Sequence, residues 1–151
     1  MIKVALANIK DANKIALCAQ NAYSDEIKKK FGDEKSNDYP TSNCVEKDIE
    51  KFTYYKIMLD DEIIGGVYLV FRNRETAIVE DFCIHPLYQN KGVGTKAYKQ
   101  IEKLNSQVYK WLLCTPTYSE ENQNFYSKLG YLATGKEFED GIEVIKYEKN
   151  I

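Results

Sequence analysis

One run of the sequence has the residue types of an anion-binding loop. It reads Glu80-Asp-Phe-Cys-Ile-His-Pro-Leu-Tyr-Gln-Asn-Lys-Gly-Val-Gly-Thr95, where a strand-like stretch precedes a loop and two glycines that open an amphipathic segment. Glycines let a backbone approach a phosphate closely, and the first N–H groups of a helix lack intrahelical partners and point at the ligand. Thr95 adds a hydroxyl, and Lys91 and Lys96 add positive charge. The run predicts a phosphate cradle, with a solvated helix start as the alternative.

Two other phosphate-binding motifs fit this run poorly. The spacing Gly92-x-Gly94-x-x-Ala97 matches a dinucleotide fingerprint, but Gly92 lies eight positions after Ile84, and that motif follows its strand almost at once. The fingerprint also needs an acidic residue about twenty positions on, after the next strand. Here that strand ends with Leu113-Cys-Thr115, which contains no acidic residue. The Walker A motif needs Gly-Lys-Ser/Thr after a Gly and four residues, and the run lacks it.

A third pattern fits. The spacing Gln89-x-x-Gly92-x-Gly94 resembles the acetyl-CoA signature of the GNAT N-acetyltransferase superfamily. A second run, Asn122-Gln-Asn-Phe-Tyr-Ser-Lys-Leu-Gly-Tyr131, is similar to that family's motif N-x-x-F-Y-x-K-x-G-F/Y. The strand–helix–strand–helix spacing between the two motifs also matches the family. The motifs extend over residues 78–131, and the order of elements resembles the family over nearly the whole chain.

The resemblance implies roles for the matching residues. Backbone groups near Cys83 and Ile84 should hydrogen-bond the pantetheine arm of acetyl-CoA. Asn122 and Tyr126 match positions that contact the cofactor near its sulfur, and Tyr126 is the candidate acid that protonates the departing thiolate. The amide groups that should hold the pyrophosphate belong to Gln89, Asn90, Lys91, Gly92, Val93, Gly94 and Thr95.

The reaction also needs a base, because an alkylammonium is not a nucleophile until it loses a proton. Glu80 and Asp81 lie on the strand that the resemblance places at the cofactor. Alternation along a strand predicts that Glu80 shares a face with Phe82 and Ile84, and that Asp81 points the other way with Cys83. We expect Glu80 to be the base, directly or through water, with Asp81 as the second candidate. For both, a lysine partner or a backbone cap is the structural alternative.

The hydrophobic pattern predicts the elements that position these residues. Their order, βααβββαβαββ, predicts an α/β (mixed α+β) fold, the GNAT fold, with a mixed, mostly antiparallel sheet of about seven strands flanked by about four helices. The polar segment 32–43 is expected to be an irregular loop that could cover the acceptor. Strands are predicted over residues 1–7, 53–59, 63–71, 76–84, 108–114, 131–137 and 142–147, and helices over 11–23, 44–52, 93–104 and 120–129.

The length and net charge of the chain argue against some classes of function. The chain of 151 residues suits one domain, residues 1–151, and its net charge of −2 argues against a protein that coats nucleic acid or an anionic membrane. Residues 84–119 nevertheless hold five lysines and one acid, which is compatible with an anionic cofactor. No membrane span or signal peptide is evident, so we expect a cytoplasmic protein.

The cysteines do not predict a metal site. Four widely spaced cysteines and a single histidine make zinc improbable, and each cysteine is expected to be a small, buried, free thiol. Trp111 is expected in the core, and His85 and Tyr118 are expected to be plain loop residues.

The sequence predicts an acetyl-CoA-dependent N-acetyltransferase of EC class 2.3.1. It should act without a metal on the primary amine of a small molecule, by direct transfer in a ternary complex. Protein or peptide acetylation and a non-catalytic acyl-CoA-binding module stay open as alternatives. A homodimer also stays open.

Overall fold

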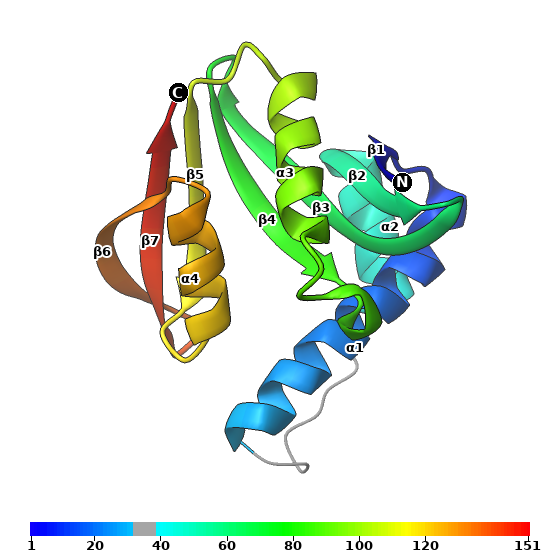
Figure 1. Ribbon diagram of the computed structural model, residues 1–151, viewed down its shortest axis with the longest axis horizontal. Coiled ribbons are helices and arrows are strands. Elements are labelled where there is room, and N and C mark those ends of the chain that lie inside the picture. The colour runs from blue at the N-terminus through cyan, green and yellow to red at the C-terminus, as the bar shows by residue number, and fades with distance from the viewer. Residues whose placement is uncertain (32–38) are drawn as a thin grey trace. The chain divides into compact units, whose positions relative to one another are not determined.

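The computed structural model describes residues 1–31 and 39–151 (Figure 1). The predicted order of elements is confirmed, and so is the mixed seven-stranded sheet, whose strands pair in the order β1-β2-β3-β4-β5-β7-β6. Most of the predicted loop, residues 32–38, lies outside the described residues. The elements are β1 (Ile2–Leu6), α1 (Ala12–Phe31), α2 (Ser42–Lys51), β2 (Thr53–Leu59), β3 (Glu62–Asn73), β4 (Thr76–Ile84), α3 (Val93–Leu104), β5 (Lys110–Pro116), α4 (Glu120–Lys128), β6 (Leu132–Glu139) and β7 (Ile142–Asn150).

The chain forms two compact units. Unit 1 comprises residues 1–70 and 80–104, and unit 2 comprises residues 71–79 and 105–151. No helix in the described part of the chain is long and apolar enough to cross a membrane. The expectation of a single domain remains a prediction.

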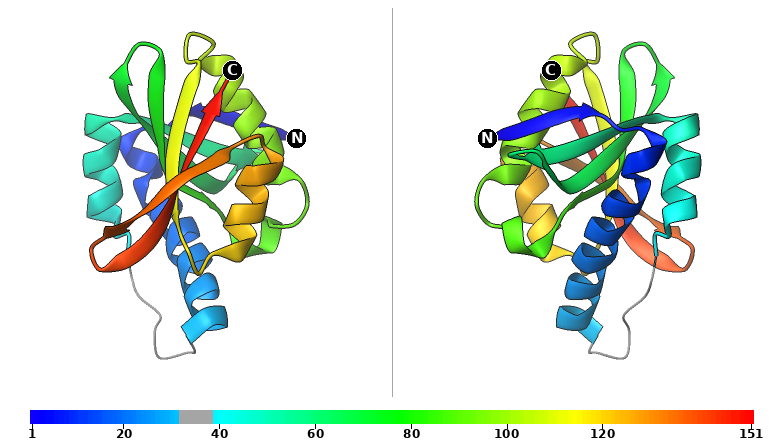
Figure 2. Two further views of the ribbon diagram at one scale, coloured as in Figure 1. Left: turned by 90° about the vertical axis from the view of Figure 1, so that its left-hand side faces the viewer. Right: turned by 90° about the vertical axis from the view of Figure 1, so that its right-hand side faces the viewer.

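Unit 1 is built on an antiparallel meander. β1 pairs with β2, and β2 pairs with β3, with an irregularity between Ile57 and Met58. α1 and α2 lie side by side (Figure 2) and share one buried cluster with β2. Gln100 of α3 fixes that helix to the edge strand, because its side-chain amide accepts from the Val4 N–H at 2.8 Å and donates to the Ile2 carbonyl at 2.7 Å. The shared cluster consists of Ala12, Ile15, Ala16, Val45 and Tyr54.

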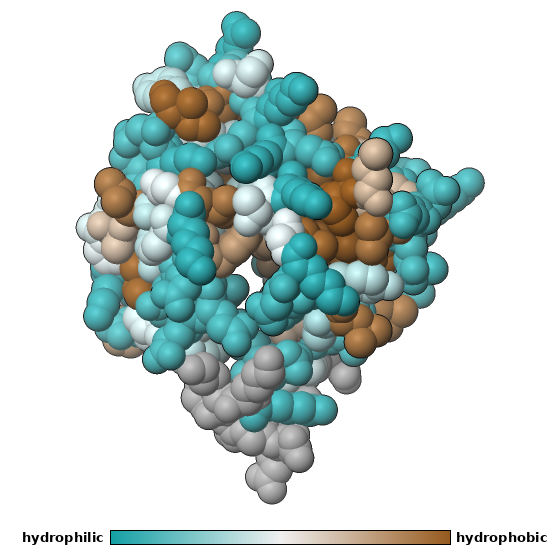
Figure 3. Space-filling model, in the orientation of Figure 1, coloured by the Kyte–Doolittle hydropathy of each residue, from teal (hydrophilic) through white to brown (hydrophobic). Residues whose placement is uncertain are grey.

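The surface of unit 1 carries some apolar side chains. Figure 3 shows apolar side chains near β1 and β2 within a largely hydrophilic face. The exposed large side chains of this region include Met1, Leu6 and Ile9. Several of the apolar side chains in this view adjoin one another, and nothing in the described part of the chain shows what covers them, so we assign them no function.

Unit 2 is built around β5. β5 pairs in parallel with the first residues of β4 and antiparallel with β7. β6 pairs antiparallel with β7 and forms the edge of the sheet. Trp111 on β5 is fully buried, which confirms its expected place in the core. α4 contributes Tyr126 to an aromatic cluster with Tyr131 and Tyr147. Every residue of β6 is exposed.

Candidate active site

The backbone of β4 changes geometry at Asp81. Its φ of 51° lies in the left-handed region, which Asp and Asn tolerate better than most residues with a side chain. A residue with this conformation interrupts the pleat of a strand, as a β-bulge does. The prediction that Glu80 and Asp81 point to opposite faces assumed regular alternation, which the φ of Asp81 interrupts, so it stays a prediction. Burial is the main cause that raises the pKa of Tyr39 and Tyr68, and the charges of Asp81 and Glu80 add to it, so both carboxylates act electrostatically on the same two phenols.

β3 approaches this part of β4 unusually closely. A Cβ atom added to Gly65 would lie 2.1 Å from the carbonyl oxygen of Cys83 and 3.2 Å from the Cα atom of Ile84. The His85 N–H donates to the Ile64 carbonyl at 2.7 Å. Because backbone atoms occupy this space, residue 65 has to be glycine. Gly65 lies outside both motifs, although a Gly-Gly pair inside a β-branched strand indicates close backbone approach.

Asp81 has electrostatics suited to a base. Burial, and then the charge of Asp48 on α2, raise the pKa of Asp81 from 3.8 to about 6. Burial also raises the pKa of Asp48, while Lys51 opposes that shift. A catalytic base works best when its pKa lies near the working pH. This environment favours Asp81 as the base, where the sequence placed Glu80 first.

Aromatic rings accompany these carboxylates. The ring of Tyr68 stacks on Phe52, with centroids 5.1 Å apart, and its centroid lies 5.3 Å from that of Tyr54. Burial is the main cause that raises the pKa of both Tyr54 and Tyr68, and Asp81 and Asp48 add to it. These residues act on one another electrostatically, and we call them the acidic–aromatic cluster. Tyr39 precedes α2, and the others lie on α2, β2, β3 and β4: Asp48, Tyr54, Tyr68, Glu80 and Asp81.

The loop before α3 has the backbone of an anion-binding nest. Asn90 and Gly92 have φ values of 63° and 77°, and α3 begins at Val93. Left-handed residues among right-handed ones turn successive N–H groups toward one point. Within the described residues, the amides of residues 90–95 have no protein acceptor, whereas the next one, Lys96, donates to the Gly92 carbonyl. These residues can therefore hold an anion through backbone N–H groups.

Gln89 has a different place from the one expected. Its backbone N–H donates to the Pro86 carbonyl at 3.3 Å, within a short 3-10 turn. Its side-chain amide donates to the Ile84 carbonyl at 2.8 Å. Gln89 thus ties the loop to the end of β4, and the nest consists of the residues that follow it.

Two thiols of unit 1, those of Cys18 and Cys83, are buried, as expected. Burial is the largest cause that raises the pKa of Cys18 to about 11 and that of Cys83 to about 12. Such thiols are poor nucleophiles at neutral pH. The expectation of burial is wrong for Cys114, which is exposed, and Cys44 is half-buried.

Unit 2 holds the residues of the second motif. Asn122 and Tyr126 are one turn apart on α4, so they share a helix face. The Asn122 side chain donates to the Thr115 hydroxyl at 3.5 Å, and Gln123 donates to the Thr117 carbonyl at 2.9 Å. These contacts attach the first turn of α4 to the end of β5. Tyr126 is 7% exposed and packs on other aromatic rings.

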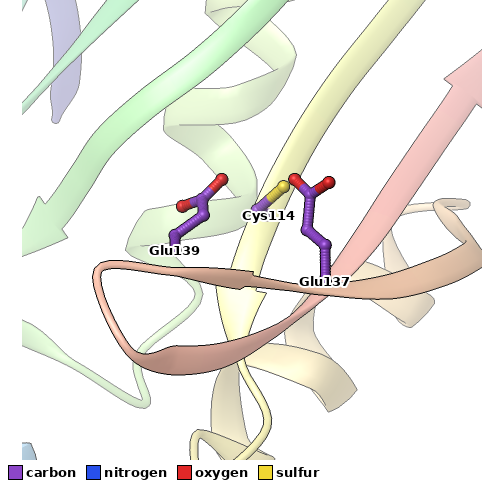
Figure 4. A group of neighbouring side chains, drawn as sticks. All are labelled: Cys114, Glu137 and Glu139. Carbon is purple, nitrogen blue, oxygen red and sulfur yellow. The ribbon is translucent and has the colours of Figure 1, made fainter.

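A second group of charged side chains lies on unit 2. Figure 4 shows the thiol of Cys114 on β5 beside the carboxylates of Glu137 and Glu139 on β6, with all three ligand atoms within 4.8 Å of one another. All three residues are exposed, and Glu137 lies 4.0 Å from the ammonium of Lys146. Exposed acidic groups of this kind are common without a metal, so we assign them no metal role.

Comparisons with known proteins agree with the motifs. The model of the Acetyltransferase (GNAT) family matches residues 19–131. The protein YrkN of Bacillus subtilis (strain 168) is 27% identical over 130 residues, which cover 83% of this chain and 70% of that protein.

Two solved structures share the fold. A GNAT family acetyltransferase of Streptococcus agalactiae 2603 has a TM-score of 0.85 at 18% identity, covering 99% of this chain and 95% of that one. The PaiA N-acetyltransferase of Thermoplasma acidophilum, in complex with coenzyme A, has a TM-score of 0.84 at 15% identity, covering 100% and 99%. The family match extends over most of the sequence, and this chain therefore belongs to the GNAT acetyltransferase family.

Proposed function

We propose that this acetyltransferase moves the acetyl group of acetyl-CoA to the primary amine of a small molecule, by direct transfer while both are bound. The observation that carries the proposal is the nest at residues 90–95, whose amides have no protein acceptor among the described residues and which directly follows the β4 carboxylates in the chain. The amides of the nest hold the pyrophosphate, and Lys91 adds positive charge. The relative from Thermoplasma acidophilum was solved with coenzyme A, which supports this choice of cofactor.

The proposed chemistry removes two protons from the acceptor nitrogen and gives one to the departing thiolate. Asp81 accepts a proton from the acceptor ammonium, so that the amine nitrogen can attack the thioester carbonyl. As the carbon–sulfur bond breaks, Tyr126 donates its phenol proton to the departing thiolate. The attacking nitrogen loses its second proton as the tetrahedral intermediate collapses, and this proton restores the phenol of Tyr126. The products are a neutral N-acetylated amine, CoA with a free thiol and the proton held by Asp81. The role of Asp81 is supported by its raised pKa, and that of Tyr126 by the match of α4 to the family's second motif.

The two buried thiols of unit 1 are poorly suited to carry the acetyl group. An acetyl-enzyme intermediate needs a nucleophile, and the Cys18 and Cys83 thiols are buried with raised pKa values. Initial rates measured over a matrix of acetyl-CoA and amine concentrations test this point. We expect intersecting reciprocal plots and no acetylated protein by intact mass spectrometry. Parallel plots together with an acetylated protein would contradict direct transfer.

The acceptor class is tested by identifying the product. The protein is incubated with acetyl-CoA, a mixture of small primary amines and a set of peptides with free N-termini and lysines. We expect the acetyl group on small amines. Acetylation of peptides alone would favour the protein acetyltransferase alternative, and cofactor binding without any product would favour the binding module.

We expect Gly92→Val to raise the KM for acetyl-CoA by about tenfold or more, because a β-branched residue strains the left-handed backbone by roughly 1–2 kcal/mol and distorts the nest. Steady-state kinetics measures the change. Gly141→Val is a matched control, since Gly141 has φ 80° and, like Gly92, open space where a Cβ would be. An unchanged KM in Gly92→Val would remove the nest from cofactor binding.

We expect Tyr126→Phe to lower kcat by about 10- to 100-fold with little change in the KM for acetyl-CoA, because the phenol acts only on the leaving thiolate. Tyr147→Phe is the control, because its ring belongs to the same aromatic cluster, 6.2 Å from Tyr126. Equal turnover in Tyr126→Phe and the wild type would show that another group is the acid.

A further inference from the structure

We infer that Gln100 of α3 is a positioning residue for the cofactor, because its side-chain amide sets where the nest at the start of α3 lies relative to the sheet. This inference rests on the proposed function, which assigns the nest to the pyrophosphate of acetyl-CoA. Gln100 lies outside both family motifs, so neither motif gives it a role.

The amide of Gln100 takes the place of a neighbouring strand at the edge of the sheet. β1 stands first in the order of the strands, and its inner side pairs with β2. On the outer side, the Val4 N–H donates to Oε1 of Gln100 at 2.8 Å, and Nε2 of Gln100 donates to the Ile2 carbonyl at 2.7 Å. A peptide group of an adjacent strand would bond such a pair of groups. Both bonds are short, so they define one position of Gln100 along β1.

The apolar face of α3 does not define such a position by itself. The helix buries Val93, Ala97, Tyr98 and Ile101. Apolar contact is non-directional, so it favours burial of this face without selecting one register of the helix on the strand. Two directional hydrogen bonds from the Gln100 side chain do select a register.

The nest lies close enough to Gln100 to move with it. Gln100 is seven residues after Val93, where α3 begins, so the two positions are roughly 10 Å, or about two turns, apart. A helix of this length moves as a unit, so a shift at Gln100 also moves the nest amides. At the other end, Gln89 holds the loop to the Ile84 carbonyl of β4 at 2.8 Å. The nest is thus held to the sheet through both β4 and β1.

A displaced nest should affect one kinetic constant above all. The pyrophosphate takes no part in bond breaking, so its contacts contribute equally to the ground state and the transition state. Loss of the Gln100 hydrogen bonds should therefore raise the KM for acetyl-CoA and leave kcat and the KM for the amine nearly unchanged. A variant that was merely less stable would contain fewer folded molecules, which lowers the apparent kcat and leaves both KM values unchanged.

The test compares Gln100→Met with Gln107→Met. Methionine keeps the length of the side chain but cannot form the two bonds, and Gln107 is exposed in the turn after α3. We expect Gln100→Met to raise the KM for acetyl-CoA by about tenfold, with kcat within about twofold of the wild type. Gln107→Met should keep both wild-type values. An unchanged KM for acetyl-CoA in Gln100→Met, or a fall in kcat alone, would overturn the inference.

A measurement on the wild-type protein decides the question even if Gln100→Met does not fold. If the Gln100 bonds favour cofactor binding, bound cofactor must favour these bonds by the same factor. We expect saturating CoA to slow hydrogen exchange of the Val4 N–H more than that of the Ala7 N–H, which donates to the Tyr54 carbonyl at 2.9 Å. Equal slowing of the two amides, or none at Val4, would overturn the inference.

The outcomes separate this inference from the proposed function. A raised KM for acetyl-CoA in Gly92→Val together with an unchanged KM in Gln100→Met would overturn the inference alone. An unchanged KM in both variants would also remove the nest from cofactor binding. If the wild type acetylates no amine while CoA still slows exchange at Val4, the proposed reaction fails and the role of Gln100 in cofactor binding stands.

Discussion

Asp81→Asn should lower kcat for acetyl transfer by about 10²- to 10³-fold and, at the same time, stabilise the folded protein at pH 8. The loss of activity follows because the amide cannot accept the proton of the acceptor ammonium. The gain in stability follows because the carboxylate is held in a site where burial and Asp48 disfavour its charge. Asn has nearly the same shape and tolerates the φ of 51° at this position, so the backbone should be kept.

The stability effect depends on pH in a defined direction. The pKa of Asp81 is about 6 in the folded protein and 3.8 in the reference state, so folding costs free energy only where the group is charged. Two pKa units correspond to roughly 2–3 kcal/mol, which Asp81→Asn should recover above pH 7. The gain should shrink as the pH falls through 6 and vanish near pH 3 to 4, where the carboxyl is protonated in both states. Thermal unfolding at several pH values measures it.

The pH dependence of activity should also reflect the ionisation of Asp81. We expect kcat/KM of the wild type to fall as the pH drops below about 6, because protonated Asp81 cannot act as a base. Asp140→Asn is a matched control, since Asp140 is exposed and has φ 50°. Unchanged kcat in Asp81→Asn would return the role of base to Glu80, and a loss of stability would mean that Asp81 is a structural residue.

Gly65→Ala should have the largest effect on stability. Its Cβ would lie 2.1 Å from the Cys83 carbonyl oxygen, a separation that real Cβ atoms essentially never show, so β3 or β4 must move. Overpacking of this kind costs about 3 kcal/mol or more, because backbone cannot turn away as a side chain can. For a domain of this size the melting temperature should fall by roughly 6–12 °C. Acetyl transfer should fall too, since Asp81 lies on the displaced strand.

The control for this variant is Gly135→Ala. Gly135 also lies in a strand, and an added Cβ there meets nothing within 4 Å. We expect its melting temperature to stay within a few degrees of the wild type. Equal melting temperatures for Gly65→Ala and Gly135→Ala would contradict the close approach of β3 and β4.

Local patterns in the sequence predicted the fold. β-branched and aromatic runs separated by polar turns predicted β2, β3 and β4, and the spacing of apolar residues predicted the helices. The order of elements is confirmed. The alternation of β5 could also have placed Cys114 at the surface, because Leu113 and Thr115 on either side of it are buried. The general preference of cysteine for protein interiors predicted the position of Cys114 less well than this alternation does.

The candidate site was only partly predictable. The nest is local, so two glycines and a helix start were enough to indicate it. Asp48 could not be predicted, because its effect on Asp81 depends on packing between segments far apart in the sequence. The change of geometry at Asp81 also escaped, because an aspartate inside a strand pattern does not reveal a positive φ. The effect of Asp48 and the φ of Asp81 both affect which of Glu80 and Asp81 is the better candidate for the base.

The most direct test of the account measures the CoA thiol released when the wild-type protein is mixed with acetyl-CoA, with and without small primary amines. We expect release only with an amine present, in an amount equal to that of the acetylated amine found by mass spectrometry. Release that does not depend on an amine, or no release with any amine although acetyl-CoA binds, would contradict the account.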